Sequence, residues 1–282
     1  MKKSFLLFAF ILQIGFLFGQ KDFSFVFLPD THLQPDSSVE AKFDKVAKQI
    51  NELNPDFVIS GGDMIYTAKN VNEKKAKILF DFMDSKFRQL KMPVHYTLGN
   101  HECVGILAES GMGISHSLYG KGMYEQRYGK RYQSLTNSGW NFFLLDGIKI
   151  LDKERNYTAG VDSVQIDWIR KELQLMDKTT PIVIVIHTPL LNPHAIKNSR
   201  NQLLSQNSAD VLNLFRDHNL KIILQGHTHL YMNLFFDGVH YISGGSTSQA
   251  THLNKYSDGF IFVKISNNTE EIKFIPTAIN TQ

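Results

Sequence analysis

The stretch FSFVFLPDTH, residues 23–32, places two potential metal ligands directly after a run of apolar residues. A short run rich in aromatic and β-branched residues predicts a buried strand over residues 23–28. Asp30 and His32 are two positions apart, so on an extended segment their side chains point to the same side. The stretch therefore predicts a buried strand whose carboxyl end presents a carboxylate and an imidazole to one site.

The same alternation of apolar runs and amphipathic segments continues along the chain. Further strands are predicted over residues 57–60, 93–98, 140–145, 182–186 and 221–224, with hairpin strands between 234 and 276. Amphipathic helices are predicted over residues 36–53, 73–90, 162–176 and 203–219. Residues 21–282 contain no evident linker or repeat, so the pattern predicts one α/β domain.

Residues suited to metal binding or acid–base chemistry follow five of these strands. In chain order they are Asp30 and His32, then Asp63, then Asn100-His101-Glu102, then His187, then His227 and His229. The ligand crevice of an open α/β sheet lies outside the carboxyl ends of its strands, so we expect the five groups to converge. The pair at 227 and 229 repeats the spacing of the pair at 30 and 32.

The candidate ligands are oxygen and imidazole nitrogen without thiolate, because the one cysteine, Cys103, lies outside the pattern. Such a set suits manganese, iron or zinc. The candidates outnumber what one tetrahedral site can use, so we expect two metal ions that share a bridging carboxylate.

The first 20 residues differ from the rest. A basic start is followed by the apolar run Phe5–Phe18, and polar sequence begins at Gln20. This run is shorter than the roughly 20 residues that span a bilayer. Residues 1–20 are therefore interpreted as a signal peptide and the protein as exported, periplasmic or secreted, with an uncleaved signal anchor as the alternative. No later apolar run is long enough to span a membrane, so we expect none in the mature chain.

The charge of the chain gives no sign of a nucleic-acid footprint. The formal net charge is +3, and Lys2 and Lys3 supply two of those charges. Binding to a phosphate backbone needs a concentrated excess of lysine and arginine. One cysteine excludes an intramolecular disulfide. The oligomeric state is left open by the sequence.

Together these motifs resemble the calcineurin-like metallophosphoesterase superfamily. The matching residues are Asp30-Thr31-His32, Gly62-Asp63, Gly99-Asn100-His101-Glu102, His187 and Gly226-His227-Thr228-His229, in the family's order. The resemblance implies a four-layer αββα sandwich with two mixed β-sheets and a metal site at the carboxyl ends of the strands. It also implies hydrolysis of a small phosphorylated substrate, either a phosphodiester or a phosphomonoester.

The resemblance assigns roles to individual residues. It implies that one metal is held by Asp30, His32, Asp63 and His229. The other would be held by Asp63, Asn100, His187 and His227, with Asp63 as the bridge. The catalytic residues would be Asp63 and His101, the latter a non-ligand histidine that protonates the leaving oxygen or stabilises phosphoryl charge.

Tyr66 marks a departure from two subfamilies. Protein phosphatases of the superfamily carry an Asp at this position, and purple acid phosphatases carry an iron-ligating Tyr here but a Gly in place of His32. The Asp-x-His start looks more like the bacterial phosphodiesterase-type branch. Tyr66 is interpreted as a packing or supporting residue, because His32 already supplies that coordination position. A purple-acid-type phosphatase and a non-catalytic metal-holding module remain alternatives, and the intact His101 argues against the second.

Two long segments are candidates for substrate selection. Residues 103–139 contain Tyr119, Tyr124, Arg127, Tyr128, Arg131 and Tyr132. Residues 188–209 contain Asn192, His194, Asn198 and Arg200. Long loops beside a site are often functional, but packing at the surface explains these residues equally well.

Overall fold

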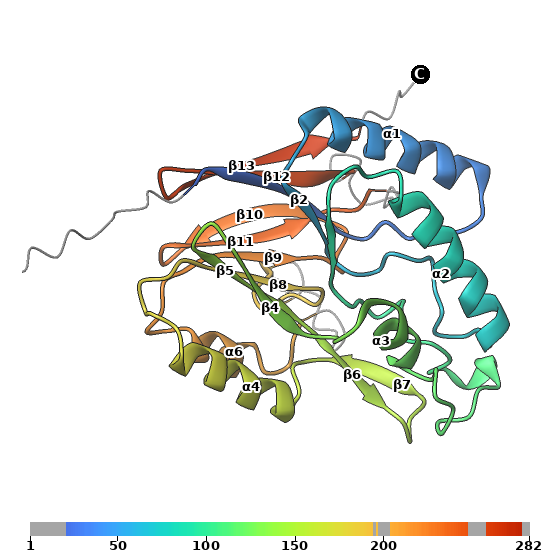
Figure 1. Ribbon diagram of the computed structural model, residues 1–282. Helices are drawn as coiled ribbons and strands as arrows, with labels where there is room; N and C mark the ends of the chain where they lie inside the picture. Colours follow the sequence, from blue (N-terminus) through green and yellow to red (C-terminus); the bar gives the residue numbers. More distant parts are fainter. Residues whose placement is uncertain (1–20, 194–195, 197–203, 248–257, 278–282) are drawn as a thin grey trace, which may run out of the picture.

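In the part of the chain that the structure describes, two large β-sheets pack face to face, with helices on both outer faces (Figure 1). The computed structural model describes residues 21–193, 196, 204–247 and 258–277. The proposed signal peptide, residues 1–20, thus lies outside the described residues. Within the described part, no helix is both long enough and apolar enough to span a bilayer.

The first sheet carries the amino-terminal strand at its centre. Its strands are β1 (Phe23–Leu28), β2 (Phe57–Ser60), β3 (Val94–Tyr96), β12 (Gly259–Ser266) and β13 (Thr269–Pro276). Their order across the sheet is β13-β12-β1-β2-β3. The pairs β1–β2 and β2–β3 are parallel, whereas β12 is antiparallel to both of its neighbours.

The second sheet is built from the later half of the chain. Its strands are β4 (Gln133–Asn137), β5 (Trp140–Leu145), β8 (Ile182–Ile186), β9 (Leu220–Gln225), β10 (Tyr231–Phe236) and β11 (Val239–Gly244). Their order is β10-β11-β9-β8-β5-β4. Strands β5, β8, β9 and β11 run parallel to one another, and the two edge strands, β4 and β10, are antiparallel to them. Asp237-Gly238 forms the predicted turn between β10 and β11, with both residues at positive φ.

The helices cover the outer faces of the sheets. Among the described residues they are α1 (Ser37–Leu53), α2 (Glu73–Phe87), α3 (Gly122–Tyr128), α4 (Ser163–Gln174) and α6 (Ser208–Leu214), with a short 3₁₀ helix at Ala108–Ser110. Helices α1 and α2 lie beyond the first sheet, and α4 and α6 beyond the second (Figure 1). The predicted cap Asp162 starts α4, since its carboxylate accepts a hydrogen bond from the backbone N–H of Gln165 at 2.8 Å.

Alternation along the strands separates three apolar layers. In β1, Val26 and Leu28 pack against helices α1 and α2, whereas Phe25 and Phe27 face the second sheet. The layer between the sheets joins these phenylalanines to β5, β8 and β9, and a third layer joins β8 and β9 to α4 and α6. Helix, sheet, sheet and helix thus stack in that order. The predicted αββα sandwich is confirmed.

The sandwich brings the carboxyl ends of strands from both sheets to one edge. Strands β1, β2 and β3 run in one direction in the first sheet, and β5, β8 and β9 run together in the second. The imidazole Nδ1 of His187, which follows β8, lies 2.9 Å from the carbonyl oxygen of Gly61, which follows β2. The two sets of strand ends therefore adjoin across the sandwich.

Some predicted elements are shorter in the structure. The helix expected over residues 203–219 is reduced to α6, because the N–H of Phe215 bonds the carbonyl of Leu212 and the chain then turns towards β9. Residue 203 itself lies outside the described residues. The segment 103–139, expected as an irregular stretch, contains α3 and β4.

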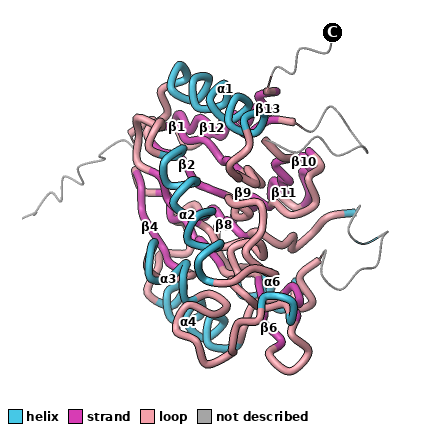
Figure 2. The backbone as a smooth tube through the Cα atoms, turned by 90° about the vertical axis from the view of Figure 1, so that its right-hand side faces the viewer, coloured by secondary structure: helices cyan, strands magenta, loops and turns pink. Residues whose placement is uncertain are grey.

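A small hairpin was not expected from the sequence. Strands β6 (Ile148–Leu151) and β7 (Asn156–Ala159) pair with each other in a separate sheet (Figure 1), and β6 lies near the lower end of the molecule in Figure 2. Arg155 at its turn donates hydrogen bonds to the carbonyls of Met112, Gly105 and Leu107. The hairpin is thus fixed to the segment that follows His101.

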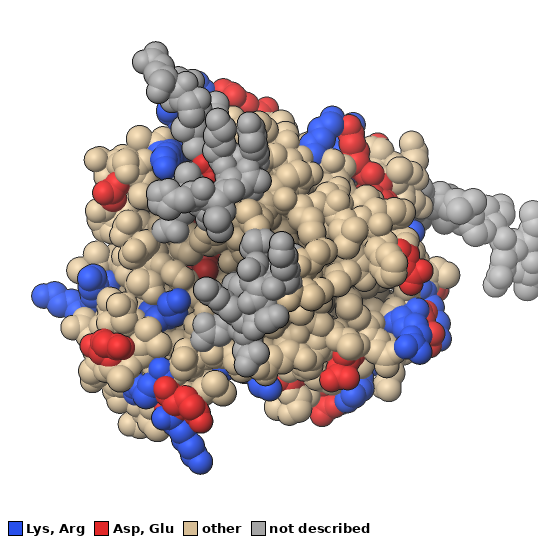
Figure 3. Space-filling model, turned by 180° about the vertical axis from the view of Figure 1, so that it is seen from behind, with Lys and Arg blue, Asp and Glu red and all other residues tan. Residues whose placement is uncertain are grey.

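Charged side chains of both signs lie interspersed around the periphery of the molecule in the view of Figure 3. The described surface visible in that view shows no large patch of one sign. This distribution agrees with the small formal net charge of +3.

Candidate metal centre

Five candidate ligands sit in a backbone conformation that favours glycine. Asp30, His32, Asp63, His227 and His229 have φ values of 51°, 43°, 51°, 69° and 54°. A non-glycine residue held in this region costs roughly 1–3 kcal/mol and persists only where its surroundings impose it. Such residues cluster at functional sites, and here they turn the side chains away from the strand axes towards one point.

The first pocket is formed by Asp30, His32, Asp63 and His229, with one potential ligand atom from each and all of these within 4.8 Å of one another. The Nε2 atoms of His32 and His229 are 2.9 Å apart. The Oδ1 atom of Asp30 lies 3.3 Å from Nε2 of His229 and 3.8 Å from Nε2 of His32.

The second pocket is centred on the fully buried imidazole of His187. Its Nε2 atom lies 3.2 Å from Oδ2 of Asp63 and 3.2 Å from Nδ1 of His227. The Oδ1 atom of Asn100 lies 3.1 Å from the same nitrogen of His187. Because Oδ2 of Asp63 also lies 3.8 Å from Nε2 of His32, this carboxylate faces both pockets.

The donor atoms fit two metal ions. Ligands held at roughly 2.0–2.2 Å from one ion lie about 3–3.5 Å from each other. The distances between donors in the two pockets, 2.9–3.8 Å, fall in or near this range. Imidazole nitrogen and carboxylate or amide oxygen, without thiolate, are donors for manganese, iron or zinc.

The charges in the pockets favour a cation. Burial alone lowers the pKa of His187, but the carboxylates of Asp63 and Asp30 outweigh it and raise that pKa to about 9. Burial acts oppositely on Asp63, whose pKa the three histidines around it nevertheless hold well below its usual range. Burial lowers the pKa of His32 well below its ordinary value, so its lone pair is available. The carboxylates thus favour positive charge beside His187, and the ionised Asp63 and neutral His32 are in the forms that bind a metal ion.

Close backbone approaches hold the ligand loops together. A Cβ atom on Gly99 would lie 2.2 Å from the backbone nitrogen of Asp63, so only glycine fits there. A Cβ atom on Gly226 would lie 2.6 Å from Oδ2 of Asp30. The backbone N–H of His227 donates to both oxygens of Asp30, each at 3.1 Å. These contacts orient the Asp30 carboxylate towards the first pocket.

Glu102 braces the loops that carry the shared carboxylate and Asn100. Its side chain is fully buried and accepts hydrogen bonds from four backbone N–H groups. They belong to Asp63, Met64 and Ile65 after β2, and to Gly99 after β3, at 2.9, 2.7, 3.2 and 2.8 Å. Burial and the nearby Asp63 carboxylate raise the pKa of Glu102 to about 7. The sequence placed Glu102 in a motif but gave it no role, because its partners lie on another loop.

His101 lies beside the shared carboxylate and belongs to neither pocket. Its backbone N–H donates to Oδ1 of Asp63 at 2.8 Å, while its Nε2 atom is 3.8 Å from Oδ2 of the same residue. Its side chain is 22% exposed, whereas that of Asp63 is 2% exposed. Burial lowers the pKa of His101, and the charge of Lys69 lowers it further. This position suits a group that meets substrate from the solvent side.

Tyr66 orients His101 through its backbone. The Tyr66 carbonyl oxygen accepts a hydrogen bond from Nδ1 of His101. The Tyr66 side chain is 43% exposed. The peptide carbonyl of Tyr66 therefore orients His101, the task that the resemblance assigns to a carboxylate in the protein phosphatases. Because the backbone provides this group, the identity of the side chain at position 66 could not predict it.

The aromatic and basic residues of the segment 103–139 are mostly engaged in packing. Arg127 forms ion pairs with Asp81 and Asp84, at 2.6 and 2.7 Å. Arg131 pairs with Asp146 and Asp162. Tyr124 is buried, Tyr128 donates to Asp84, and Tyr132 lies against Trp168.

In the other candidate segment, Asn192 is buried and donates to the hydroxyl of Ser243 at 2.9 Å. His194, Asn198 and Arg200 lie outside the described residues. For Arg127, Arg131, Tyr124, Tyr128 and Tyr132, the packing interpretation thus has the stronger support.

Most of the chain matches one protein family. The model of the calcineurin-like phosphoesterase family matches residues 23–231. The chain belongs to this family. The match includes all seven candidate ligands, from Asp30 to His229, and confirms the resemblance seen in the motifs.

Known proteins similar to this phosphoesterase are distant in sequence. A zebrafish (Danio rerio) transmembrane protein with a metallophosphoesterase domain is 24% identical over 77% of the chain, and the match spans 45% of that relative's length. A probable cyclic nucleotide phosphodiesterase of Psychrobacter arcticus is 23% identical, over 79% of the chain and 74% of the relative.

A solved structure confirms the fold. The crystal structure of a dimetal phosphatase from Danio rerio superposes with a TM-score of 0.66 at 15% sequence identity, covering 91% of this chain and 96% of that one. The structure brings all seven candidate ligands together, and their individual roles as ligands stay predictions.

Proposed function

We propose that the protein hydrolyses a phosphomonoester or phosphodiester in a reaction that depends on two metal ions. The observation that carries the proposal is the position of Asp63, whose Oδ2 atom faces both pockets while its Oδ1 atom accepts the N–H of His101. Membership of the calcineurin-like phosphoesterase family and the similarity to a dimetal phosphatase support it.

Each group of the centre has a distinct task in this proposal. Metal ions in the two pockets would supply an activated water and neutralise charge on the phosphoryl oxygens. Asp63 holds the pockets at a fixed separation, and Glu102 fixes the loops beneath it. His101 is oriented by the Tyr66 carbonyl and reachable from solvent, and in its doubly protonated form it donates the Nε2 proton to the leaving oxygen and becomes neutral.

Activity measurements on purified protein test this proposal. The protein is stripped with a chelator, reloaded with manganese, iron or zinc, and offered a panel of phosphomonoesters and phosphodiesters. We expect hydrolysis that is lost on stripping and restored by at least one metal. Failure to hydrolyse any ester with any metal, although both pockets are filled, would favour a non-catalytic metal-holding module.

We also propose that the mature protein is exported after removal of a signal peptide. The proposal rests on the order of basic, apolar and polar residues within positions 1–20. N-terminal sequencing of protein from the native host tests it. A mature chain that still begins at Met1 would contradict removal and favour a signal anchor.

A further inference from the structure

Lys69 lies on the loop beside the proposed acid, and no carboxylate of the described residues pairs with it. The backbone N–H of its neighbour Ala68 donates to the carbonyl of His101 at 2.8 Å, and the carbonyl of Lys69 accepts the N–H of Leu107 at 2.9 Å. These bonds fix Lys69 between the loop that carries Asp63 and the loop that carries His101. Among the described residues, no carboxylate forms an ion pair with its ammonium.

Two lysines whose side chains are only slightly exposed, Lys86 and Lys121, are neutralised by acidic residues. Lys86 lies 2.9 Å from Asp44 and 3.1 Å from Glu40, and Lys121 lies 2.5 Å from Asp146. An ammonium withdrawn from water without an opposite charge is costly, which explains these pairs. Half-buried Lys69 has no such pair among the described residues, so its ammonium is available to a bound anion.

An aromatic ring holds the Lys69 side chain in place. The Nζ atom lies 5.4 Å from the ring centre of Tyr157, a buried residue of strand β7. Such a cation–π contact stabilises the ammonium modestly without neutralising it. Arg155 fixes the β6–β7 hairpin, which carries Tyr157, to the loop after His101. The position of the Tyr157 ring is therefore set by these hydrogen bonds.

The loop that carries Lys69 contacts the proposed acid at two points. The Tyr66 carbonyl accepts a hydrogen bond from Nδ1 of His101, and the Ala68 N–H donates to the His101 carbonyl at 2.8 Å. An anion bound beside His101 would therefore also meet Lys69.

We propose that Lys69 binds a non-bridging phosphoryl oxygen of the substrate and thereby makes the centre prefer phosphomonoesters to phosphodiesters. A phosphomonoester carries roughly −1.5 to −2 charges at neutral pH, whereas a diester carries about one. An additional fixed cation therefore favours the monoester, and Tyr157 acts as the positioning residue. This inference rests on the proposed phosphoesterase function.

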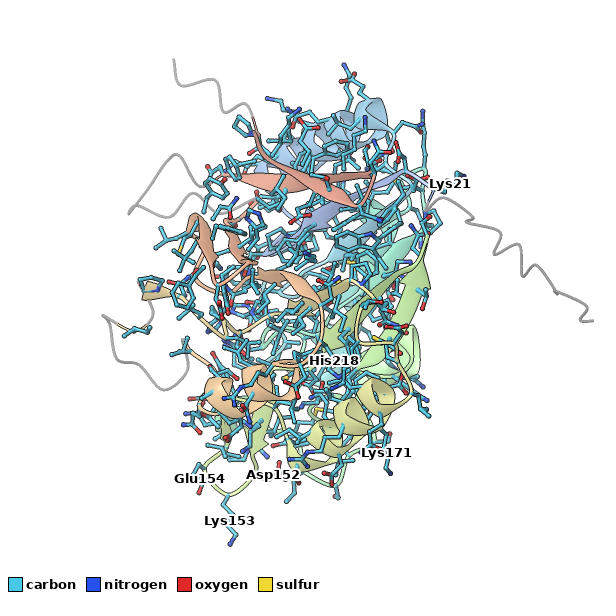
Figure 4. The ribbon with its side chains drawn as sticks, turned by 90° about the vertical axis from the view of Figure 1, so that its left-hand side faces the viewer. Lys21, Asp152, Lys153, Glu154, Lys171 and His218 are labelled. Atoms are coloured by element: carbon cyan, nitrogen blue, oxygen red, sulfur yellow. The ribbon has the colours of Figure 1, made fainter. Side chains whose placement is uncertain are left out.

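Binding of inorganic phosphate to the metal-loaded full chain tests the site independently of catalysis. In Lys69→Met we expect the dissociation constant for phosphate, measured by calorimetry, to rise about tenfold or more, because one charge-assisted hydrogen bond is lost. Metal content should stay at the wild-type level, and Lys69→Arg should recover part of the affinity. The matched control is Lys153→Met, since Lys153 projects into solvent from the tip of the β6–β7 hairpin (Figure 4).

Kinetics on paired substrates provide the second measurement. The ratio of kcat/KM for nitrophenyl phosphate to that for bis(nitrophenyl) phosphate should fall roughly tenfold in Lys69→Met. In Tyr157→Leu this ratio should fall less, whereas Tyr157→Phe, which keeps the ring, should retain it.

The outcomes separate the two proposals. Phosphate affinity and substrate ratio within about twofold of wild type in Lys69→Met, with metals bound, would overturn the inference. Phosphate binding that depends on Lys69, in a protein that hydrolyses no ester, would support the anion site and contradict the proposed function.

Discussion

The two pockets share one carboxylate but differ in how firmly the protein holds their imidazoles. In the second pocket, His187 donates from Nδ1 to the Gly61 carbonyl at 2.9 Å, which fixes the ring and leaves Nε2 for a ligand bond. In the first pocket, the Nδ1 atom of His32 is buried without a hydrogen-bond partner among the described residues.

Exposure does not separate the pockets, because each contains one buried and one half-buried imidazole. These are His32 and His229 in the first pocket, and His187 and His227 in the second. The difference lies in the hydrogen bonds, which prepare the second pocket, whereas the first depends more on the ion to order its ligands. One dinuclear centre can therefore contain a firmly held ion and an exchangeable one.

The largest expected effect concerns His101, which belongs to neither pocket. In His101→Ala we expect both metals to stay bound and the rate to fall by roughly 10²–10⁴-fold. The loss should be greater for alkyl esters than for nitrophenyl esters, because a stable leaving anion needs no proton.

Steady-state kinetics with both ester classes and elemental analysis test this expectation. His240→Ala, on β11, serves as the control. An equal loss for both leaving groups would instead assign His101 to stabilisation of phosphoryl charge. Loss of metal would show that His101 is a ligand after all.

The next largest effect is expected for Glu102, whose carboxylate holds the loops of Asp63 and Asn100 together. In Glu102→Gln, the amide nitrogen cannot accept the two N–H groups that one carboxylate oxygen accepts. Each buried donor left without an acceptor costs roughly 1–3 kcal/mol. We expect a lower Tm in thermal unfolding and metal affinity reduced about 10–100-fold in calorimetric titration.

The matched control is Glu109→Gln, which changes an exposed glutamate on the same segment. Unchanged Tm and metal affinity in Glu102→Gln would show that the four hydrogen bonds do not support the centre.

The order of metal release tests the comparison of the pockets itself. Because only the second pocket has a described hydrogen bond that fixes its histidine, we expect the first pocket to bind its ion roughly tenfold more weakly or worse. Crystals of the manganese-loaded protein, soaked in increasing chelator, should lose anomalous signal first beside His32 and His229. Earlier loss beside His187 would reverse the comparison.

The smallest effect is expected for Tyr66→Phe. The backbone carbonyl, which phenylalanine retains, is the group that accepts from His101, and the side chain is 43% exposed. We expect kcat/KM to stay within about twofold of wild type for every ester. A weaker version of the leaving-group trend of His101→Ala would show that the phenol itself supports the imidazole.

The sequence predicted the strands and the ligands because both are marked locally. Apolar runs such as Ile182–Ile186 identify buried strands, and Asp30, His32 and His187 follow directly after them. Parallel strands must then bring these ends to one edge. The gathering of the candidate ligands could therefore be predicted from the strand pattern, whereas the αββα sandwich was predicted from the resemblance of the motifs to the family.

What the sequence did not reveal depends on contacts between distant segments. Glu102 accepts hydrogen bonds from a loop 37 to 39 positions away. The β6–β7 hairpin was not predicted because its turn consists of charged residues without a typical turn motif. Its packing against the segment after His101 depends on contacts between residues far apart in the sequence. Lys69 looks like an ordinary surface lysine until that hairpin places Tyr157 beside it.

The metal content of Asp63→Asn tests the central claim most directly. This change keeps an oxygen that can accept the His101 N–H but replaces the carboxylate that faces both pockets. Elemental analysis should find two metals in wild-type protein and weakened binding of both together in the variant. One tightly bound metal in the wild type, unaffected by Asp63→Asn, would contradict a dinuclear centre bridged by this residue.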